Sequence, residues 1–156
     1  MAEGEFALVR QHLEIALSKS AAWVGEHDLY AMLADAAAQQ RDEAALRQYT
    51  PLAEEAAARY DHKLYQAVAH RAWGVVHRLA GEHAEAEARL SQALELLRGL
   101  DTRWQIGRTL FEVGELARVR DDAAGAREHF SRALTAFEEM GAAPDAARAR
   151  AALEAG

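Results

Sequence analysis

The histidines and carboxylates are the side chains of this sequence that could hold a metal ion, and their spacing argues against it. His70 and His77 lie one heptad apart on the packing stripe of one expected helix, about 10.5 Å along its axis at ~1.5 Å per residue. That separation is too large for both to bind one ion without ligands from another helix. His83 and Glu87 have i, i+4 spacing, but no third ligand stands near them. We therefore predict no metal site, and we expect His77 to be a core residue with one hydrogen bond.

Catalytic motifs are equally scarce. The sequence has no glycine-rich phosphate loop, no nucleophile elbow and no His-Glu-x-x-His pair. It contains no cysteine, which excludes thiol catalysis, disulfides, cysteine-ligated zinc and iron–sulfur clusters. Its many carboxylates are expected on solvated helix faces. We predict neither an enzyme nor a cofactor.

The composition predicts closely packed helices as the elements that position the remaining polar side chains. Among 156 residues, 51% are apolar and 7% aromatic, and 38 are alanine, the strongest helix former. The apolar runs are too short to span a membrane, and Glu3 and Glu5 stand where a signal peptide would carry positive charge. The net charge of −7 argues against nucleic acid as a partner. We expect a cytoplasmic chain, and its 16 arginines against 2 lysines are typical of a bacterial source rich in GC.

A repeat of 40 residues runs through the sequence, most clearly at Ala34, Gly74 and Gly114. Other positions recur in the same frame: Leu33, Trp73 and Val113; Leu46, Ala86 and Ala126; Thr50, Leu90 and Phe130; Ala53, Ala93 and Ala133. Each unit holds two stretches with apolar residues at helical spacing. We predict a single all-α domain over residues 1–156, with repeats at 22–60, 62–100 and 102–141, a leading helix at 3–18 and a capping helix at 144–155.

This frame predicts about eight antiparallel helices joined by loops of about two to five residues. Gly74 and Gly114 would lie where the first helix of a unit crosses its second helix, with Ala86 and Ala126 as their counterparts. Larger side chains such as Trp73, Leu90, Phe130 and Phe137 would fill the spaces between units.

Helix ends are marked by several residues. Asp121 or Asp122 is suited to cap the helix that follows it, Gly141 to end that helix, and Pro144 to begin the last one. Pro51 falls inside the expected helix of residues 43–60. We expect it to kink or split that helix after Tyr49, with Thr50 as the cap of the restart.

The residues Trp73-Gly74, Ala86, Leu90 and Ala93, repeated as Val113-Gly114, Ala126, Phe130 and Ala133, resemble the tetratricopeptide repeat. The resemblance covers roughly residues 22–155. It departs from the family in period, which is 40 instead of about 34, and in the first-helix tyrosine, replaced by Ala37, His77 and Ala117. Longer repeats of this kind look like the helical-repeat regions of large bacterial regulators and signalling ATPases. The resemblance implies an α-solenoid whose first helices line a concave, partner-binding face.

That mapping gives the candidate binding residues Asp28, Met32, Asp35, Arg71, Val75, Arg78, Arg108, Glu112, Glu115 and Arg118. One interpretation is a groove for a peptide of mixed charge, in which Arg71, Arg78 and Arg108 could hold a carboxylate. The other is a solvated face with i, i+4 pairs such as Arg108–Glu112. Of the positions that chaperone-binding members use to clamp a terminal carboxylate, only Arg108 carries a suitable side chain, so we do not expect chaperone tails as partners.

The sequence therefore predicts a non-enzymatic module that binds a protein or peptide. Two alternatives stay open. The chain could be the ligand-sensing module of a bacterial transcriptional regulator. It could also be a scaffold that forms a homodimer through its end helices, with Phe6, Leu13 and Leu17 as the self-association residues. Trp23 and Trp104 could be exposed anchors, or they could cover the core between units.

Overall fold

The computed structural model describes residue 8, residues 10–15 and residues 25–156, and every regular element in this part of the chain is an α-helix. Residues 10–15 are helical and fall inside the expected leading helix. The helices that follow are α2 (Glu26–Gln40), α3 (Glu43–Arg59), α4 (Lys63–Leu79), α5 (His83–Arg98), α6 (Arg103–Val119), α7 (Ala123–Glu139) and α8 (Ala143–Glu154). The all-α prediction is confirmed. No helix in the described ranges is long and apolar enough to cross a membrane.

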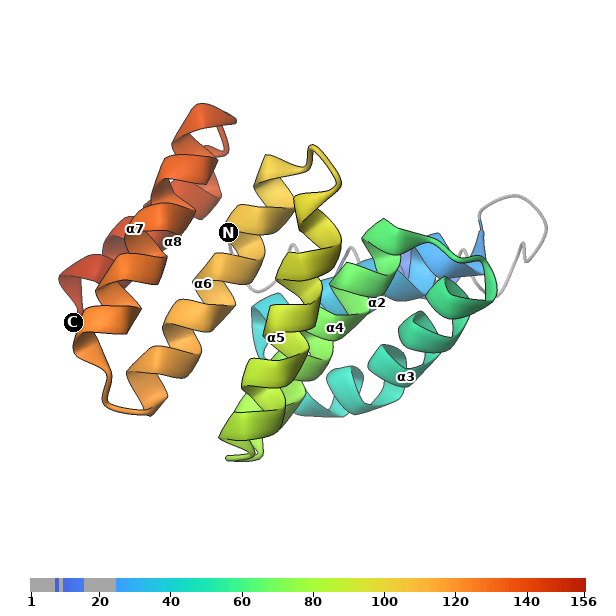
Figure 1. Ribbon diagram of the computed structural model, residues 1–156. Coiled ribbons are helices and arrows are strands. Elements are labelled where there is room, and N and C mark those ends of the chain that lie inside the picture. The colour runs from blue at the N-terminus through green and yellow to red at the C-terminus, as the bar shows by residue number, and fades with distance from the viewer. Residues whose placement is uncertain (1–7, 9, 16–24) are drawn as a thin grey trace.

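The helices lie side by side, from α2 and α3 at one end of the molecule to α7 and α8 at the other (Figure 1). Each helix packs against the next one in the chain, and α2 also contacts α4, while α4 also contacts α6. We call α2, α4 and α6 the first helices of the three units and α3, α5 and α7 the second helices. The first helices therefore touch one another as well as their own second helices.

One turn geometry recurs at spacings of 20 residues, half the repeat seen in the sequence, except at the turn between α5 and α6 around residue 101, which does not adopt it. The residues with positive φ in these turns are Arg41, Asp61, Gly81, Asp121 and Gly141, with φ of 56°, 47°, 78°, 59° and 66°. The N–H of each following residue donates to the carbonyl oxygen five residues earlier, at 2.8–3.0 Å, which satisfies a free carbonyl at the helix end. The next helix starts directly afterwards, and the Asp122 carboxylate accepts from the N–H of Gly125 at 2.9 Å. The expected cap is confirmed there, whereas Pro144 is the second residue of α8 and not its first.

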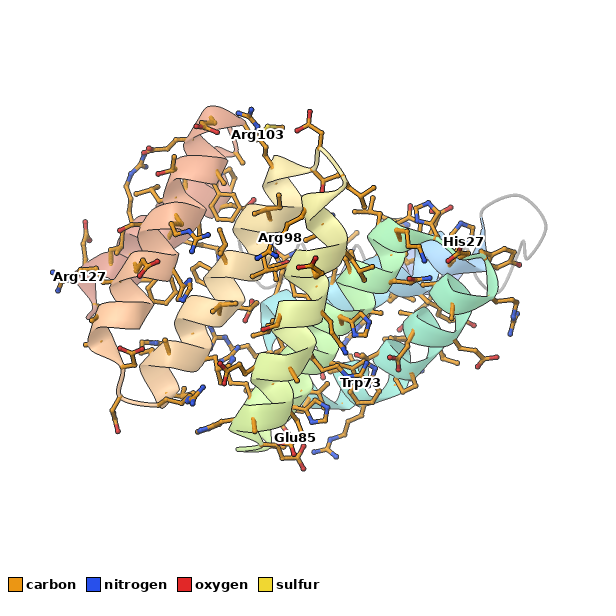
Figure 2. All side chains as sticks on the ribbon, viewed as in Figure 1. His27, Trp73, Glu85, Arg98, Arg103 and Arg127 are labelled. Carbon is orange, nitrogen blue, oxygen red and sulfur yellow. The ribbon has the colours of Figure 1, made fainter. Side chains whose placement is uncertain are left out.

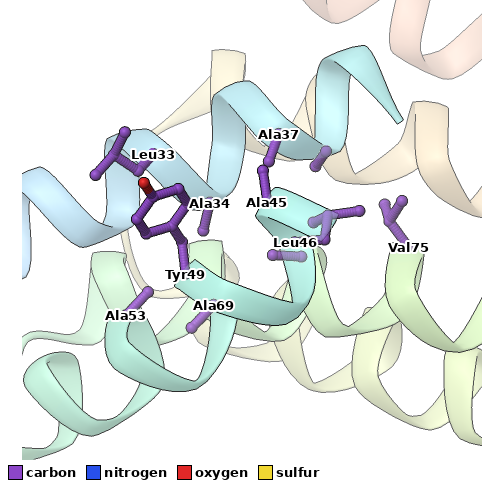
Figure 3. Close-up of a cluster of buried hydrophobic side chains, with 11 residues drawn as sticks. Leu33, Ala34, Ala37, Ala45, Leu46, Tyr49, Ala53, Ala69 and Val75 are labelled. Carbon is purple, nitrogen blue, oxygen red and sulfur yellow. The ribbon is translucent and has the colours of Figure 1, made fainter. Parts of the chain in front are cut away.

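The core is built largely from alanine, because small side chains let helices approach closely. Between α2, α3 and α4 a cluster contains Leu33, Leu46, Tyr49 and Val75, with alanines between them. Figure 3 shows Tyr49 beside Leu33, and Leu46 directed toward Val75. A second cluster of buried apolar side chains, which includes Phe137, joins α6, α7 and α8. Each fully buried leucine or phenylalanine contributes about 1.5–3 kcal/mol to folding.

The glycines at the helix crossings lie where the repeat predicts them. A Cβ atom added to Gly74 would lie 2.6 Å from Cγ and Cδ2 of Leu90, and one added to Gly114 would lie 2.7 Å from Cδ1 and Cε1 of Phe130. The side chains that occupy the space above these glycines are thus Leu90 and Phe130, not Ala86 and Ala126 as we expected. The reason is that a large side chain from the second helix fills the room that each glycine leaves.

Pro51 does not split its helix. The helix α3 runs without interruption from Glu43 to Arg59 with Pro51 inside it, so Thr50 caps no restart. Pro51 is exposed, and on that side of the helix water can replace the hydrogen bond that proline cannot make. The hydroxyl of Thr50 is buried and has no hydrogen-bond partner among the described residues.

Candidate functional site

The candidate binding residues lie on the first helices, which bring most of them together. We call the side of α2, α4 and α6 that carries them the first-helix face. The structure buries several of these side chains: Arg71, Val75, Arg78, Arg108, Glu112 and Glu115, with exposed fractions between 0% and 6%. Met32 is exposed to 51% of its area, and the side chain of Arg118 to 46%. The solvated face that we considered from the sequence is therefore mostly a buried one.

Asp35 joins all three first helices through its carboxylate. Its Oδ1 accepts from Arg71 Nη2 at 2.8 Å and from Arg108 Nη2 at 3.2 Å, while its Oδ2 accepts from Gln39 Nε2 at 2.9 Å. Burial alone would raise the pKa of Asp35, but the charges of Arg108 and Arg71 lower it to about 2. The carboxylate is therefore ionised at neutral pH and holds two guanidinium groups on neighbouring helices.

Arg71 is the central cation of this group. Its Nη1 donates to the side-chain Oε1 of Gln105 at 2.7 Å and to Thr109 Oγ1 at 3.3 Å. Burial lowers the pKa of Arg71 below its ordinary value, and the nearby Asp35 opposes this shift. Arg71 thus connects α4 to α6, and its planar guanidinium fixes the directions of these hydrogen bonds.

A second set of ion pairs lies about two helical turns further along α4 and α6. Arg78 Nη2 donates to Glu112 Oε2 at 2.9 Å, and Arg78 Nη1 lies 3.7 Å from Glu115 Oε2. Glu115 also accepts from Arg41 Nη2 at 2.6 Å and from Arg118 Nη2 at 2.8 Å. Burial would raise the pKa of Glu115, but the hydrogen bond and charge of Arg41 hold it below the usual value. Glu112 therefore pairs with Arg78, and the i, i+4 pair with Arg108 does not form.

Residues of α8 add further polar contacts to Arg108 and its neighbours on α6. Arg108 Nη1 lies 3.8 Å from Asp145 Oδ1, and Trp104 Nε1 donates to Asp145 Oδ2 at 2.9 Å. The Arg108 guanidinium also lies over the Trp104 ring, 5.6 Å from its centroid. Arg148 lies over the Phe111 ring at 5.0 Å, and its pKa is lowered, first by burial and then by Arg108. Trp104 is thus a half-buried residue that connects α6 to α8.

We call the connected ionic groups of this face the charged network: Arg41, Arg71, Arg78, Arg108, Arg118, Arg148, Asp35, Glu112, Glu115 and Asp145. Arginines outnumber carboxylates in it. Two of its buried N–H groups, Arg78 Nε and Arg108 Nη1, have no hydrogen-bond acceptor in the described part of the chain. A buried donor without an acceptor is unfavourable by about 1–3 kcal/mol, so each of these two N–H groups makes the folded network less favourable than a fully hydrogen-bonded one.

Arg41, Asp145 and Arg148 were not among the residues that the sequence singled out. The repeat frame contained a signal for one of them, because Arg148 lies 40 residues after Arg108 and occupies the equivalent position on α8. Arg41 carried no such signal, since it lies in the turn after α2 and reaches Glu115 across 74 positions of sequence.

Asp28 lies apart from the charged network, near the start of α2. Burial, together with a hydrogen bond to Asp28, raises the pKa of Tyr65 to about 12. The ring of His27 lies close by, with centroids 5.4 Å from Tyr65 and 5.5 Å from His62. Asp28 therefore belongs to an aromatic cluster at the end of the molecule and not to the row of ion pairs.

The histidines of α4 are held by stacking and single polar contacts. His77 stacks on Trp73, with centroids 5.6 Å apart, and its Nδ1 lies 2.6 Å from Glu82 Oε2. Trp73, which we expected in the core, is half-buried, and its Nε1 donates to Glu54 Oε2 at 2.8 Å. Burial, with a contribution from Arg89, lowers the pKa of His70. Within the described residues no group of three or more histidine, aspartate or glutamate side chains could hold a metal ion.

The leading helix is bound to the rest of the chain by polar contacts. Arg10 Nη1 donates to Asp42 Oδ2 at 2.8 Å, and Tyr49 donates to Glu14 Oε1 at 2.7 Å. Leu13, one of the expected self-association residues, is half-buried against the core cluster of α2, α3 and α4. Phe6 and Leu17 lie outside the described residues, as does Trp23.

No protein-family model matches the chain, and no curated protein matches it in sequence.

Proposed function

We propose that the chain is a tetratricopeptide-like α-solenoid, bacterial and cytoplasmic, that binds a protein or peptide segment across its first-helix face. Two features support the solenoid. Each first helix packs on its own second helix, and α4 also packs on the first helices α2 and α6 on either side of it, which is how stacked repeats share a core. The glycines at the crossings of α4 with α5 and of α6 with α7 recur at the repeat spacing. On this proposal the chain catalyses no reaction and needs no cofactor.

The observation that carries the binding proposal is the excess of arginine in the charged network. Arg78 Nε and Arg108 Nη1 are buried donors without acceptors. Carboxylate oxygens are the natural acceptors for guanidinium groups, because both groups are planar and can form two parallel hydrogen bonds. We therefore assign the ligand an aspartate or glutamate side chain that would reach this face.

The arginines of this face are already held in place before any ligand arrives. Asp35 fixes Arg71 and Arg108, and Glu112 fixes Arg78, at 2.8–3.2 Å. A side chain that is ordered in advance loses little entropy on binding. On this proposal the buried arginines keep the face rigid, and a ligand carboxylate would meet the exposed arginines at its edge, Arg41 and Arg118, whose side chains are 40% and 46% exposed.

Met32 supplies the apolar part of the same face. It projects from α2, one turn before Asp35, and 51% of its area is exposed. Methionine adapts its shape to different partners because its side chain is unbranched and polarisable. A segment that places an acidic residue on the network and an apolar residue on Met32 fits both features.

A peptide library tests this proposal without disturbing the buried ion pairs. Peptides selected on the immobilised protein should be enriched in Asp or Glu next to an apolar residue. Replacing that Asp or Glu by Asn or Gln should weaken binding about tenfold or more, as measured by fluorescence anisotropy, since one charge-assisted contact is worth about 1.5–3 kcal/mol.

A matched pair of variants locates the binding face. Met32→Asp puts a negative charge on the first-helix face, whereas Met140→Asp makes the same change at the end of α7, where methionine is 54% exposed. Met32→Asp should weaken binding about tenfold and Met140→Asp should not, with both variants unfolding at the temperature of the parent. Equal binding by both variants, or failure to select any acidic peptide, would overturn the proposal.

Self-association remains the alternative function that the described surface allows. Leu8 on the leading helix is 55% exposed, whereas Leu13 is half-buried against the chain's own core. A homodimer through the end helices would therefore use Leu8, and Leu8→Glu should abolish it. Light scattering over a range of concentrations distinguishes this homodimer from a monomer.

A further inference from the structure

Glu54 joins α3 to α4 and α5 through its carboxylate. Its Oε2 accepts from Trp73 Nε1 of α4 at 2.8 Å, and its Oε1 accepts from Arg89 Nη1 of α5 at 2.5 Å. The Arg89 guanidinium also lies over the Trp73 ring, 5.4 Å from its centroid, and Figure 2 shows Trp73 between α3 and α5. We call Glu54, His70, Trp73 and Arg89 the α3–α5 contact, because α3 and α5 each pack on α4 and meet through these side chains.

His70 has to be neutral in this contact. Its Nδ1 lies 3.1 Å from Arg89 Nη1. A guanidinium group can only donate hydrogen bonds, so His70 Nδ1 accepts and carries no proton. The charged groups that face His70 are Glu54 from α3 and Arg89 from α5, and the described residues of α2 and α6 place no charge against it. Burial, followed by Arg89, lowers the pKa of His70, and Glu54 opposes this shift.

His77, two turns further along α4, has the opposite requirement. Its Nδ1 lies 2.6 Å from Glu82 Oε2. A carboxylate can only accept, so His77 Nδ1 carries a proton and donates. The ring of His77 also stacks on Trp73, with centroids 5.6 Å apart. One helix therefore holds two histidines beside the same indole, and an added proton disturbs the polar contact of only one of them.

The combination of an imidazole and an arginine does not recur at the equivalent places of the other units. Forty residues earlier, the equivalents of Glu54, His70 and Arg89 are Glu14, Tyr30 and Tyr49, and Tyr49 donates to Glu14 at 2.7 Å. Forty residues later they are Leu94, Leu110 and His129. The contact between α3 and α5 is therefore the place in this row where acid would bring two positive charges together.

We propose that the α3–α5 contact is a proton-sensitive switch, closed at neutral pH and opened when His70 is protonated. The Nδ1–H of an imidazolium would point at an N–H of Arg89, so their hydrogen bond would be lost and the two cations would repel. The Arg89 side chain is 28% exposed and can turn toward water. Trp73 then loses the cation over its ring, and α3 loses its direct contact with α5. The switch does not depend on the peptide proposed for the first-helix face.

The indole N–H of Trp73 reports on this switch in NMR, and Trp73→Phe assigns its resonance. Because His77 also stacks on Trp73, the test compares His77→Gln with the double variant His70→Gln/His77→Gln. Glutamine at position 70 can still accept from Arg89, but it cannot become charged. Between pH ~7.5 and ~5, the Trp73 resonance of His77→Gln should shift with the same midpoint as the His70 ring protons, below pH 6.5. The double variant should show no such shift.

The separation of α3 and α5 is measured independently by electron paramagnetic resonance. The chain has no cysteine, so Gln48→Cys and Ser91→Cys, both at exposed positions, place one nitroxide label on α3 and one on α5. The distance between the labels should be longer at pH ~5 than at pH ~7.5, and His70→Gln should abolish the increase. The proposal is overturned if His70 of the parent protein titrates at or above pH 6.5, if the label distance does not change with pH, or if it increases equally in His70→Gln.

Discussion

The crossing between α6 and α7 is tight enough that one added methyl group should destabilise the protein. In Gly114→Ala, the new Cβ would lie 2.7 Å from Cδ1 and Cε1 of Phe130 and 3.1 Å from its Cζ, well inside the ~3.5–4.0 Å of a normal carbon–carbon contact. The Phe130 ring has little room to move away. Only 2% of the area of Phe130 is exposed, and the centroid of the Phe111 ring lies 5.2 Å from that of the Phe130 ring.

The net magnitude follows from two opposing effects. Overpacking a buried site is unfavourable by about 1–3 kcal/mol, whereas replacing glycine by alanine inside a helix is favourable by about 1 kcal/mol. Gly114→Ala should therefore lower the free energy of unfolding by about 1 kcal/mol. Urea unfolding followed by far-ultraviolet circular dichroism measures this difference.

Gly99→Ala is the matched control for this substitution. Gly99 ends α5 with φ of −83°, and an added Cβ would meet no atom within 4 Å. The change should leave the free energy of unfolding unaltered or raise it by up to about 1 kcal/mol, because alanine restricts the unfolded chain.

A double-mutant cycle tests whether the Phe130 ring is the cause. In unit one the equivalents of Gly114 and Phe130 are Ala34 and Thr50, so a methyl group on the first helix is matched there by a smaller side chain on the second. Phe130→Val should reduce stability by itself, but in combination with Gly114→Ala the loss should be smaller than the sum by about 1–2 kcal/mol. Additive effects, or a Gly114→Ala variant at least as stable as the parent, would refute the packing argument.

Three further predictions concern buried polar groups and are measured by urea unfolding. The pKa of Asp35 in the folded protein is about 2, below its ordinary value of 3.8. The ionised carboxylate therefore adds about 2 kcal/mol to the free energy of unfolding above pH ~4, and this contribution is lost as the pH falls to ~2. In Asp35→Asn the free energy of unfolding should depend less on pH in that range. Glu112→Ala leaves Arg78 without its closest partner and should reduce stability by about 3–5 kcal/mol, while the pair Arg78→Met/Glu112→Leu should lose much less. Thr50→Val removes a buried hydroxyl that has no partner and should raise stability by about 1 kcal/mol.

The helices could be predicted because their pattern is local and repeated. Apolar spacing and the 40-residue frame predicted helices at 43–60 and 144–155, and the observed α3 and α8 end within one residue of those bounds. The 20-residue regularity of the turns was harder to see, because the left-handed position is glycine in only some of them. Arg41, Asp61 and Asp121 take the same conformation as Gly81 and Gly141, and aspartate tolerates it by virtue of its short polar side chain.

The charged network could not be predicted from local spacing, since its pairs join distant positions. Arg71 reaches Asp35 across 36 residues and Arg41 reaches Glu115 across 74. Helical i, i+4 arithmetic paired Arg108 with Glu112, but Asp35 of α2 reaches across to Arg108 of α6 and lies 3.2 Å from it. A solvated i, i+4 pair on one helix is worth only about 0.3–0.5 kcal/mol, so it does little to hold Arg108 to Glu112.

The two sides of the first helices differ in how closely their residues repeat from unit to unit, and this difference explains the charged network. The side that meets the second helices repeats closely, as Ala34, Gly74 and Gly114 show. The other side does not repeat: the residue after each of these is Asp35, Val75 and Glu115. A strictly repeated charge would place like charges on adjacent first helices, where they would repel. Divergence between units allows each carboxylate to meet arginines of its neighbours. Because these pairs depend on which helices lie side by side, we expect them to favour the observed order of helices over other packings of the alanine-rich faces.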